Sequence, residues 1–539
     1  MFPIFTSLAA FSLALCWSPE WATPLFDARV SCFGVAALLL IQVLSGAAYG
    51  REVRRRLPGE PGEFRVRRLA RAENAYRFLG LALYASAVAN LNWPRVAWQT
   101  WHLGGIPGVS LAAALSPYFL FLLATSVGIA RAWRSSSGEG PSIRVVLASE
   151  ARLAALPFVP AFLIVTGIDL LSLNRGIRLL LGSVPFTGIA LLAAIMVVTL
   201  LTSPSWMPLV LRARPFPDSP LRSDLIRLCE RAGVTTPAFW IWPSADSGSV
   251  NAMVVGIRSR GRAVFFTESM LQSLSADELG AVLAHELGHV RYRHAAVYAC
   301  FAMGAVAAVA AAEAALSHLD SDLSRTTLVA ALAASIAATF GAFYRRFERQ
   351  ADLFAARLVP ANVFIATLEK VASLSGNVRK VWSFTHTSIE QRVNFLLEAG
   401  LRPESAARFE HRLSKAVLAG LVVAAFAGGA GIWTAVKQVA AAPVERAKLE
   451  AEESAGEARL AWEKGERDGA IGKAAEAAKG DAKWELLVAD MLFEAGRAAE
   501  ARPHYERAKR EWRDGTEERA EIEERLELIR GIEERARRK

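Results

Sequence analysis

The residues best suited to chemistry lie in one short segment, His285-Glu286-Leu287-Gly288-His289. On a helix, His285 and His289 are four residues apart and share one face, so two neutral imidazoles can hold one metal ion. Glu286 follows the first histidine, where its carboxylate can act as general base on a zinc-bound water. A helix can also hold two histidines and a glutamate by chance. The full pattern favours a zinc site.

A catalytic zinc ion needs a third protein ligand and one open position. A metzincin would have a third histidine six residues after His289, but that position is Ala295. His294, five residues on, is interpreted as an ordinary boundary histidine. Glu348 and Asp352 lie four residues apart in a later helical segment. Glu348 can be the third ligand and Asp352 can accept the ring proton of a ligand histidine. In isolation, a solvated helix face with arginine partners is the favoured interpretation of this pair; beside the first motif, the ligand interpretation is favoured.

These side chains need a helix and a small sheet to position them. Ser275-Ala276-Asp277-Glu278 fits a capping box, which predicts that a helix begins just before the histidine motif. Residues 223–232 are typical of a helix. Residues 238–242, 250–257 and 262–267 are typical of short strands, because they are rich in aromatic and β-branched residues and are separated by glycine and serine.

The composition is that of a membrane protein. The chain has 539 residues, of which 53% are hydrophobic. A helix crosses the hydrocarbon core in about 20 apolar residues. About nine spans are therefore expected, at residues 1–17, 30–49, 78–92, 109–130, 153–173, 184–211, 295–316, 326–343 and 416–436. The first could be a signal peptide, but no arginine precedes Arg29, which favours an uncleaved span. The four cysteines include no C-x-x-C pair, so neither a disulfide framework nor a thiolate zinc site is expected.

Charge gives the expected orientation. The formal net charge is +10, and nine arginines lie between residues 51 and 77 and four between residues 131 and 152. The alternate loops hold only Arg95 in one case and Arg175 with Arg178 in another. The positive-inside rule places the basic loops in the cytoplasm, so the charge indicates topology and not nucleic-acid binding. The site then lies on the cytoplasmic side of a multi-pass cell membrane, the bacterial inner membrane, and the C-terminal tail lies opposite.

The motifs together resemble the HtpX and type I CAAX prenyl protease family, peptidase family 48 of the metallopeptidases. The resemblance covers residues 220–397. It rests on the histidine motif, on Glu348 to Asp352, on the apolar hairpin between them, on Asn251-Ala252-Met253-Val254-Val255-Gly256, and on the segment from His386 to Arg392. The family has proline where Thr387 stands here, so this loop departs from the family pattern.

The resemblance implies a fold and further site residues. Asn251 and Ala252 would lie in the strand that lines the cleft and pairs with the substrate backbone. His386 would help to stabilise the oxyanion, and Arg392 would shape the cleft. The fold class expected is a mainly α, polytopic membrane protein with a small α+β zincin domain of gluzincin type, a short sheet and a helical tail.

The expected domains follow from these features. Residues 1–211 form the N-terminal transmembrane region with about six spans. Residues 212–414 form the metallopeptidase domain, including a transmembrane hairpin at about 295–343. Residues 415–436 form the last span, and residues 437–539 form a helical tail.

The tail has a composition of its own, rich in Ala, Glu, Lys and Arg. Its small and aromatic residues fit the packing positions of a tetratricopeptide repeat, namely Val488, Ala489, Leu492, Gly496, Ala501, Tyr505 and Ala508. A weaker copy precedes it at Gly465, Ala470, Ala474 and Ala477, offset by 31 residues instead of 34. A charged coiled coil or a single helical hairpin remains an equal alternative. Either structure suits binding of a protein partner.

The sequence therefore predicts a zinc metalloendopeptidase with one zinc ion per chain. Its substrates are expected to be proteins or peptides, chiefly membrane proteins, within or beside the lipid bilayer. The alternative is a protease-type signal transducer in which the outer tail senses a ligand or partner and controls cleavage of a regulator. A scaffold without activity is disfavoured because the ligands and Glu286 are all present.

Overall fold

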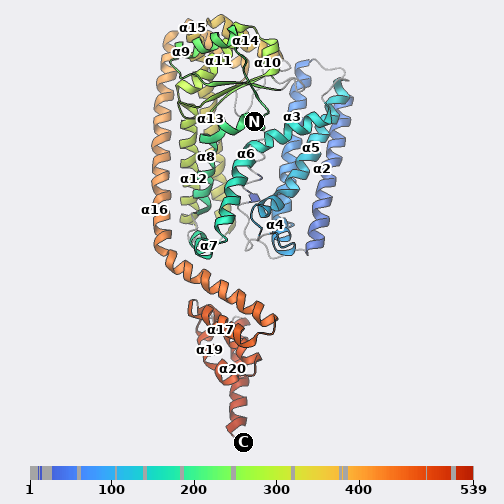
Figure 1. The fold of residues 1–539 in the computed structure, drawn as a ribbon, viewed down its shortest axis with the longest axis vertical. Helices are drawn as coiled ribbons and strands as arrows, with labels where there is room; N and C mark the ends of the chain where they lie inside the picture. Colours follow the sequence, from blue (N-terminus) through green and yellow to red (C-terminus); the bar gives the residue numbers. More distant parts are fainter. Residues whose placement is uncertain are drawn as a thin grey trace. The chain divides into compact units, whose positions relative to one another are not determined.

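The computed structural model describes residues 10, 13–14, 27–56, 62–103, 106–137, 142–182, 187–243, 250–316, 322–374, 379, 387–480, 482–511 and 517–537. The described residues are mostly helical, with one small sheet (Figure 1). They divide into two compact units. One comprises residues 1–170 and 191–430, and the other comprises residues 171–190 and 431–539. Each unit is described by itself.

Long apolar helices make up the N-terminal region. Their bounds are α2 Ala28–Arg56, α3 Gly62–Ala89, α4 Trp93–Arg95, the π-helix η3 Val96–Thr100, α5 Val109–Ser137, α6 Ile143–Leu171 and α8 Thr187–Val210. Helices α2, α3 and α5 pack against one another along their lengths (Figure 1). Apolar side chains such as Phe33 and Leu40 are exposed on α2, as expected for a helix that faces lipid.

Four helical stretches in the described part of the chain are long and apolar enough to cross a membrane: Ala28–Glu52, Val109–Arg131, Ala193–Val210 and Pro403–Thr434. They correspond to four of the expected spans. Helix α11 (Ala276–Arg291) is followed by α12 (His294–Leu316), with a bend of 45° between them. If α11 and the part of α12 up to Val309 count as one broken span, they add a fifth candidate. Within α6, Phe158–Leu171 is a shorter apolar stretch. Residues 78–89 of the expected span 78–92 and residues 326–343 are helical without meeting this test, and most of the first expected span lies outside the described residues.

A four-stranded sheet precedes the histidine motif in the chain. Its strands are β1 Arg214–Pro215, β2 Ala238–Trp242, β3 Ala252–Val255 and β4 Ala263–Thr267, in the spatial order β1-β2-β4-β3. Strand β4 lies between β2, to which it is parallel, and β3, to which it is antiparallel. Because β4 is covered on both sides, all five of its residues are buried. Strand β3 is left as an edge of the sheet, next to the site.

Helices cover the sheet and carry the site (Figure 1). Besides α11 and α12 they are α9 Pro220–Arg231, α10 Glu268–Ser273, α13 Asp322–Leu358, α14 Ala361–Leu374 and α15 Ile389–Leu401. The capping box that starts α11 is confirmed: Glu278 N–H donates to Ser275 Oγ (3.3 Å), and Ser275 N–H donates to the Glu278 carboxylate (2.7 Å). Lys370 also donates to that carboxylate, at 2.7 Å. The start of the site helix is therefore fixed to α14.

The tail has a hydrophobic core of its own. Its elements are the part of α16 (Pro403–Glu463) that follows residue 430, α17 Arg467–Gly480, the 3₁₀ turn η5 Ala482–Trp484, α18 Glu485–Glu494, α19 Ala498–Glu511 and α20 Glu517–Arg537, with α7 Arg175–Gly182 in the same unit. The predicted packing residues are buried apart from Gly465 and Gly496, which occupy the turns after α16 and α18 with positive φ. A tetratricopeptide arrangement stays a prediction.

Candidate metal centre

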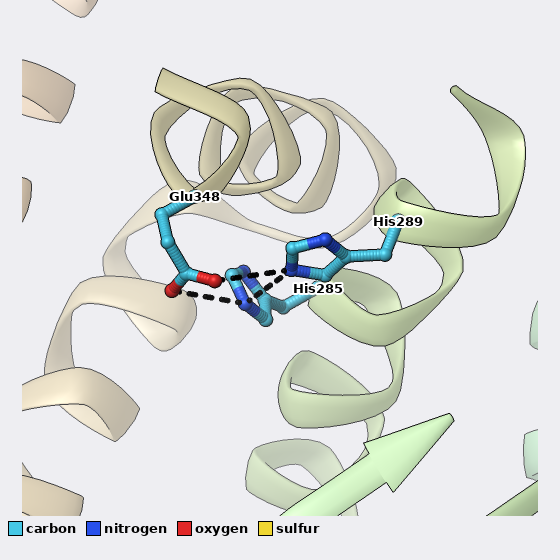
Figure 2. Close-up of side chains that lie close together, drawn as sticks. All are labelled: His285, His289 and Glu348. Atoms are coloured by element: carbon cyan, nitrogen blue, oxygen red, sulfur yellow. Dashed lines mark hydrogen bonds and ion pairs between the residues drawn. The ribbon is translucent and has the colours of Figure 1, made fainter. Parts of the chain in front are cut away.

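Two histidines project from one face of α11. His285 Nε2 and His289 Nε2 lie 3.3 Å apart, because a separation of four residues places the two rings on successive turns of the helix. Only 12% of the His285 side chain and 20% of the His289 side chain are exposed. Figure 2 shows both rings directed toward Glu348, which comes from α13.

Glu348 completes a three-residue group. Its Oε1 lies 3.4 Å from His289 Nε2 and its Oε2 lies 3.9 Å from His285 Nε2. One ligand atom from each of the three residues lies within 4.8 Å of the others. The nitrogen and oxygen donors are those that zinc accepts, and three protein ligands leave a fourth position open. The residues present therefore fit a catalytic zinc ion.

The two ligand helices touch at Gly288. A Cβ atom at this position would lie 2.9 Å from the Cα of Ala351 and 3.1 Å from its Cβ and its carbonyl oxygen. Glycine thus permits α11 and α13 to approach closely, and Ala351 itself is fully buried. Since Glu348 lies one turn before Ala351, this contact brings its carboxylate to the histidines.

Asp352 and Arg392 lie behind His285. The ring Nδ1–H of His285 donates to Asp352 at 2.9 Å, and Arg392 Nε donates to the same carboxylate at 2.8 Å. Burial alone would raise the pKa of Asp352, but the Arg392 guanidinium and His285 outweigh it and hold the pKa below its usual value. Asp352 is therefore a carboxylate that fixes the orientation of His285. The structure places Arg392 in this buried pair, with 7% of its surface exposed.

His294 lies behind His289, which the sequence did not suggest. Because Nε2 of His289 faces the other ligands, its Nδ1–H donates to His294 Nδ1 at 2.9 Å. His294 Nε2–H then donates to the side-chain amide oxygen (Oε1) of Gln350, also at 2.9 Å. The His294 ring stacks on Phe347, with ring centroids 4.1 Å apart and planes 5° from parallel. The two histidines of the motif thus have different supports, a carboxylate for His285 and a neutral chain for His289.

The Glu286 side chain points toward β3, the edge strand of the sheet. Its carboxylate accepts the backbone N–H of Val254 in β3 at 3.1 Å. Ala252 begins the same strand, and Asn251 pairs with Thr267 at its start through a 2.9 Å hydrogen bond to the threonine hydroxyl. His386, expected to stabilise an oxyanion, lies outside the described residues.

The segment that holds these residues is similar in sequence to known proteins. Residues 216–399 match the model of Peptidase family M48. The segment that holds the site is therefore similar to this family. A protease HtpX homolog of Syntrophotalea carbinolica is 37% identical over 109 residues, covering 20% of this chain and 36% of that protein. A protease HtpX homolog of Aeropyrum pernix is 28% identical over 158 residues, covering 29% of this chain and 49% of that protein.

The likeness to these relatives is partial, since the chain spans about a third to a half of their length. Among solved structures, the crystal structure of S. mikatae Ste24p aligns with a TM-score of 0.44 and 14% identity, covering 70% of this chain and 100% of that chain. The M48 segment contains every described site residue named above.

Replacing His294 with phenylalanine should weaken zinc binding by the M48 domain about 10- to 100-fold, the range found when groups behind metal ligands are removed. Phenylalanine can keep the stacking on Phe347 but cannot accept the proton of His289. Competition with a chromogenic chelator measures the change. His294→Asn, whose side-chain oxygen can replace Nδ1 as acceptor, should recover part of the affinity. His411→Phe, on the exposed face of α16, is the matched control. Unchanged affinity in His294→Phe would mean that His289 is positioned by other contacts.

Proposed function

We propose that this chain is a membrane-embedded zinc endopeptidase that hydrolyses peptide bonds of membrane or membrane-associated proteins. The observation that carries the proposal is that one ligand atom each from His285, His289 and Glu348 lies within 4.8 Å of the others. Glu286 lies on α11, the helix of the two histidines. The M48 match of this segment supports the reaction class. The charge of the loops supports a site on the cytoplasmic side.

Each residue of the site has its own role in the proposed reaction. Bound zinc would polarise the scissile carbonyl and make a coordinated water acidic enough to lose a proton near neutral pH. Glu286 would act as general base on the attacking water and would then donate a proton to the leaving amine nitrogen. Asp352, paired with Arg392, keeps the His285 ring in the tautomer that presents Nε2. His294 and Gln350 do the same for His289.

Strand β3 is suited to hold the substrate. It is an edge strand, so its outward N–H and C=O groups can pair with an extended peptide. Because Val254 N–H contacts Glu286, a peptide lying along β3 would pass beside the proposed base. We assign Asn251 and Ala252 to this binding strand. His386 is proposed to stabilise the oxyanion and Arg392 to shape the cleft through the ion pair that it forms.

Metal removal tests the proposal. Incubation of the purified protein with 1,10-phenanthroline should abolish cleavage of casein or of an unfolded membrane protein, and added zinc should restore it. The isomer 1,7-phenanthroline, which does not chelate, should have no effect. Cleavage that persists after zinc has been removed to below a tenth of an equivalent per chain would overturn the assignment.

The tail supports a second candidate, a protease-type signal transducer, because it has its own hydrophobic core. Deleting residues 444–539 separates the two. Under the main proposal, zinc content and the rate of casein cleavage change less than about twofold, as expected for a module without catalytic groups. A chain that becomes constitutively active or silent after the deletion would favour the transducer.

A further inference from the structure

A groove with a basic end runs between α2 and α5, in the N-terminal helices that the proposed reaction does not use. Its volume is about 580 Å³. The side chains along its length are apolar and include Leu39 and Val43 from α2 and Leu120 and Leu123 from α5. Two arginines line one end of the groove, Arg51 from α2 and Arg131 from α5. A long apolar channel that ends at two cations matches the two parts of an anionic lipid.

The length of the groove agrees with this match. Leu39 and Arg51 are twelve residues apart on one helix, which corresponds to about 18 Å at a rise of 1.5 Å per residue. Half of a hydrocarbon core of about 30 Å is about 15 Å. The groove therefore extends over the depth of one leaflet.

Both arginines stand where a membrane would end. The candidate spans in these helices are Ala28–Glu52 and Val109–Arg131, so Arg51 and Arg131 close the apolar stretches at the same end. Both side chains are exposed. Arginine binds phosphate oxygens through a planar fork of N–H donors, and basic pockets between membrane helices hold anionic headgroups.

Buried polar contacts behind the groove keep it open. Gln42 Nε2 donates to Thr125 Oγ1 at 2.6 Å, which ties α2 to α5. Tyr76 of α3 donates its hydroxyl to the Gln42 carbonyl at 2.7 Å and fills the space behind Gly46 and Gly128. Such interhelical hydrogen bonds stabilise contacts between membrane helices. The helix pair is thus held at a fixed spacing without side chains filling its front.

We propose that this groove binds one anionic phospholipid, with the phosphate at Arg51 and Arg131 and an acyl chain along Leu39, Val43, Leu120 and Leu123. The inference concerns the membrane region and does not depend on the proteolytic activity.

Spin-labelled lipids test the groove in vesicles that contain the full chain. Labelled phosphatidylglycerol should bind in preference to labelled phosphatidylcholine. The double variant Arg51→Gln with Arg131→Gln should reduce that preference by about fivefold for each arginine. Arg144→Gln, which removes the same charge from α6 outside the groove, should leave it unchanged. An unchanged preference in the double variant would overturn the proposal.

A second variant tests the apolar channel without altering charge. A Cβ at Gly50 meets no atom within 4 Å, so Gly50→Leu should place its side chain in the groove without strain in the helices. It should lower phosphatidylglycerol binding to the level of the double variant. Gly167→Leu, at an equally open position on α6, is the control. If Gly50→Leu keeps the full preference, the arginines attract lipid at the surface only and the groove is not a site. This variant also carries the test if the double variant fails to insert.

Discussion

Replacing Glu286 with glutamine should lower the cleavage rate about 10³-fold while one zinc ion per chain remains bound. General acid–base catalysis contributes about 10²- to 10⁴-fold, and the amide cannot accept the proton that the carboxylate takes. Glutamine has nearly the same shape, and its side-chain oxygen can still accept the Val254 N–H. The measurement is kcat/KM for casein or a labelled peptide, together with zinc content by mass spectrometry.

The control for Glu286→Gln is Asp277→Asn on the same helix. Asp277 is exposed in the first turn of α11, away from the ligands, so its loss should leave the rate within about twofold. Equal cleavage by wild type and Glu286→Gln would remove Glu286 from the mechanism. The same variant also serves as a trap, because substrates that bind but are not cut can be identified by proteomics.

Replacing Glu348 with glutamine should weaken zinc binding more than 100-fold, beyond the roughly 10- to 100-fold effect of groups behind the ligands. The carboxylate is the only charged member of the three-residue group, and 3% of its side chain is exposed. A neutral amide oxygen is a poorer ligand. It also leaves Arg392, whose guanidinium lies 3.7 Å from Glu348, with less compensating charge. Chelator competition measures the affinity, and activity should fall in parallel.

The matched control for Glu348→Gln is Glu398→Gln, an exposed glutamate on α15. Zinc affinity should not change in this variant. Thermal unfolding of both proteins in the presence of excess chelator separates loss of a ligand from loss of the fold. If Glu348→Gln retains wild-type affinity, the third ligand is a different residue.

The local parts of the site could be predicted from sequence because helical spacing determines them. Two histidines four apart share a face in any α-helix, and the capping box specified where that helix begins. Strand β2 has the predicted bounds, 238–242, because aromatic and β-branched residues are concentrated there. The prediction that Glu348 and Asp352 lie near the histidine motif depended on the family resemblance and on the ligand chemistry, since the two segments lie some sixty residues apart.

The support from His294 could not be predicted from spacing. On a continuous helix, a residue five positions after His289 points about 140° away from it, at 100° per residue. The helix is not continuous: α11 ends at Arg291, and Arg293 has a φ of 53°. The chain therefore turns and brings His294 back to the His289 ring. A positive φ at an arginine leaves no signal in the sequence, because glycine and asparagine are the residues that indicate it.

Other parts of the chain show the same limit. Four spans could be found from their hydropathy. The short strand β1, Arg214–Pro215, was not predicted, because two residues carry no periodicity. The groove between α2 and α5 also follows from the tertiary arrangement, since its lining residues belong to segments about eighty positions apart.

The contact at Gly288 limits which sequences can keep this centre. A larger residue at 288 would meet Ala351 on its backbone, with the Cα at 2.9 Å and the carbonyl oxygen at 3.1 Å. A second-site change of Ala351 to glycine removes only the Cβ and leaves both of those atoms in place. No single replacement at 351 can therefore suppress a substitution at 288, and a selection for suppressors should return revertants to glycine. Position 288 requires glycine because a side chain there would meet main-chain atoms of Ala351. Exchanging side chains between the two helices therefore cannot remove the clash.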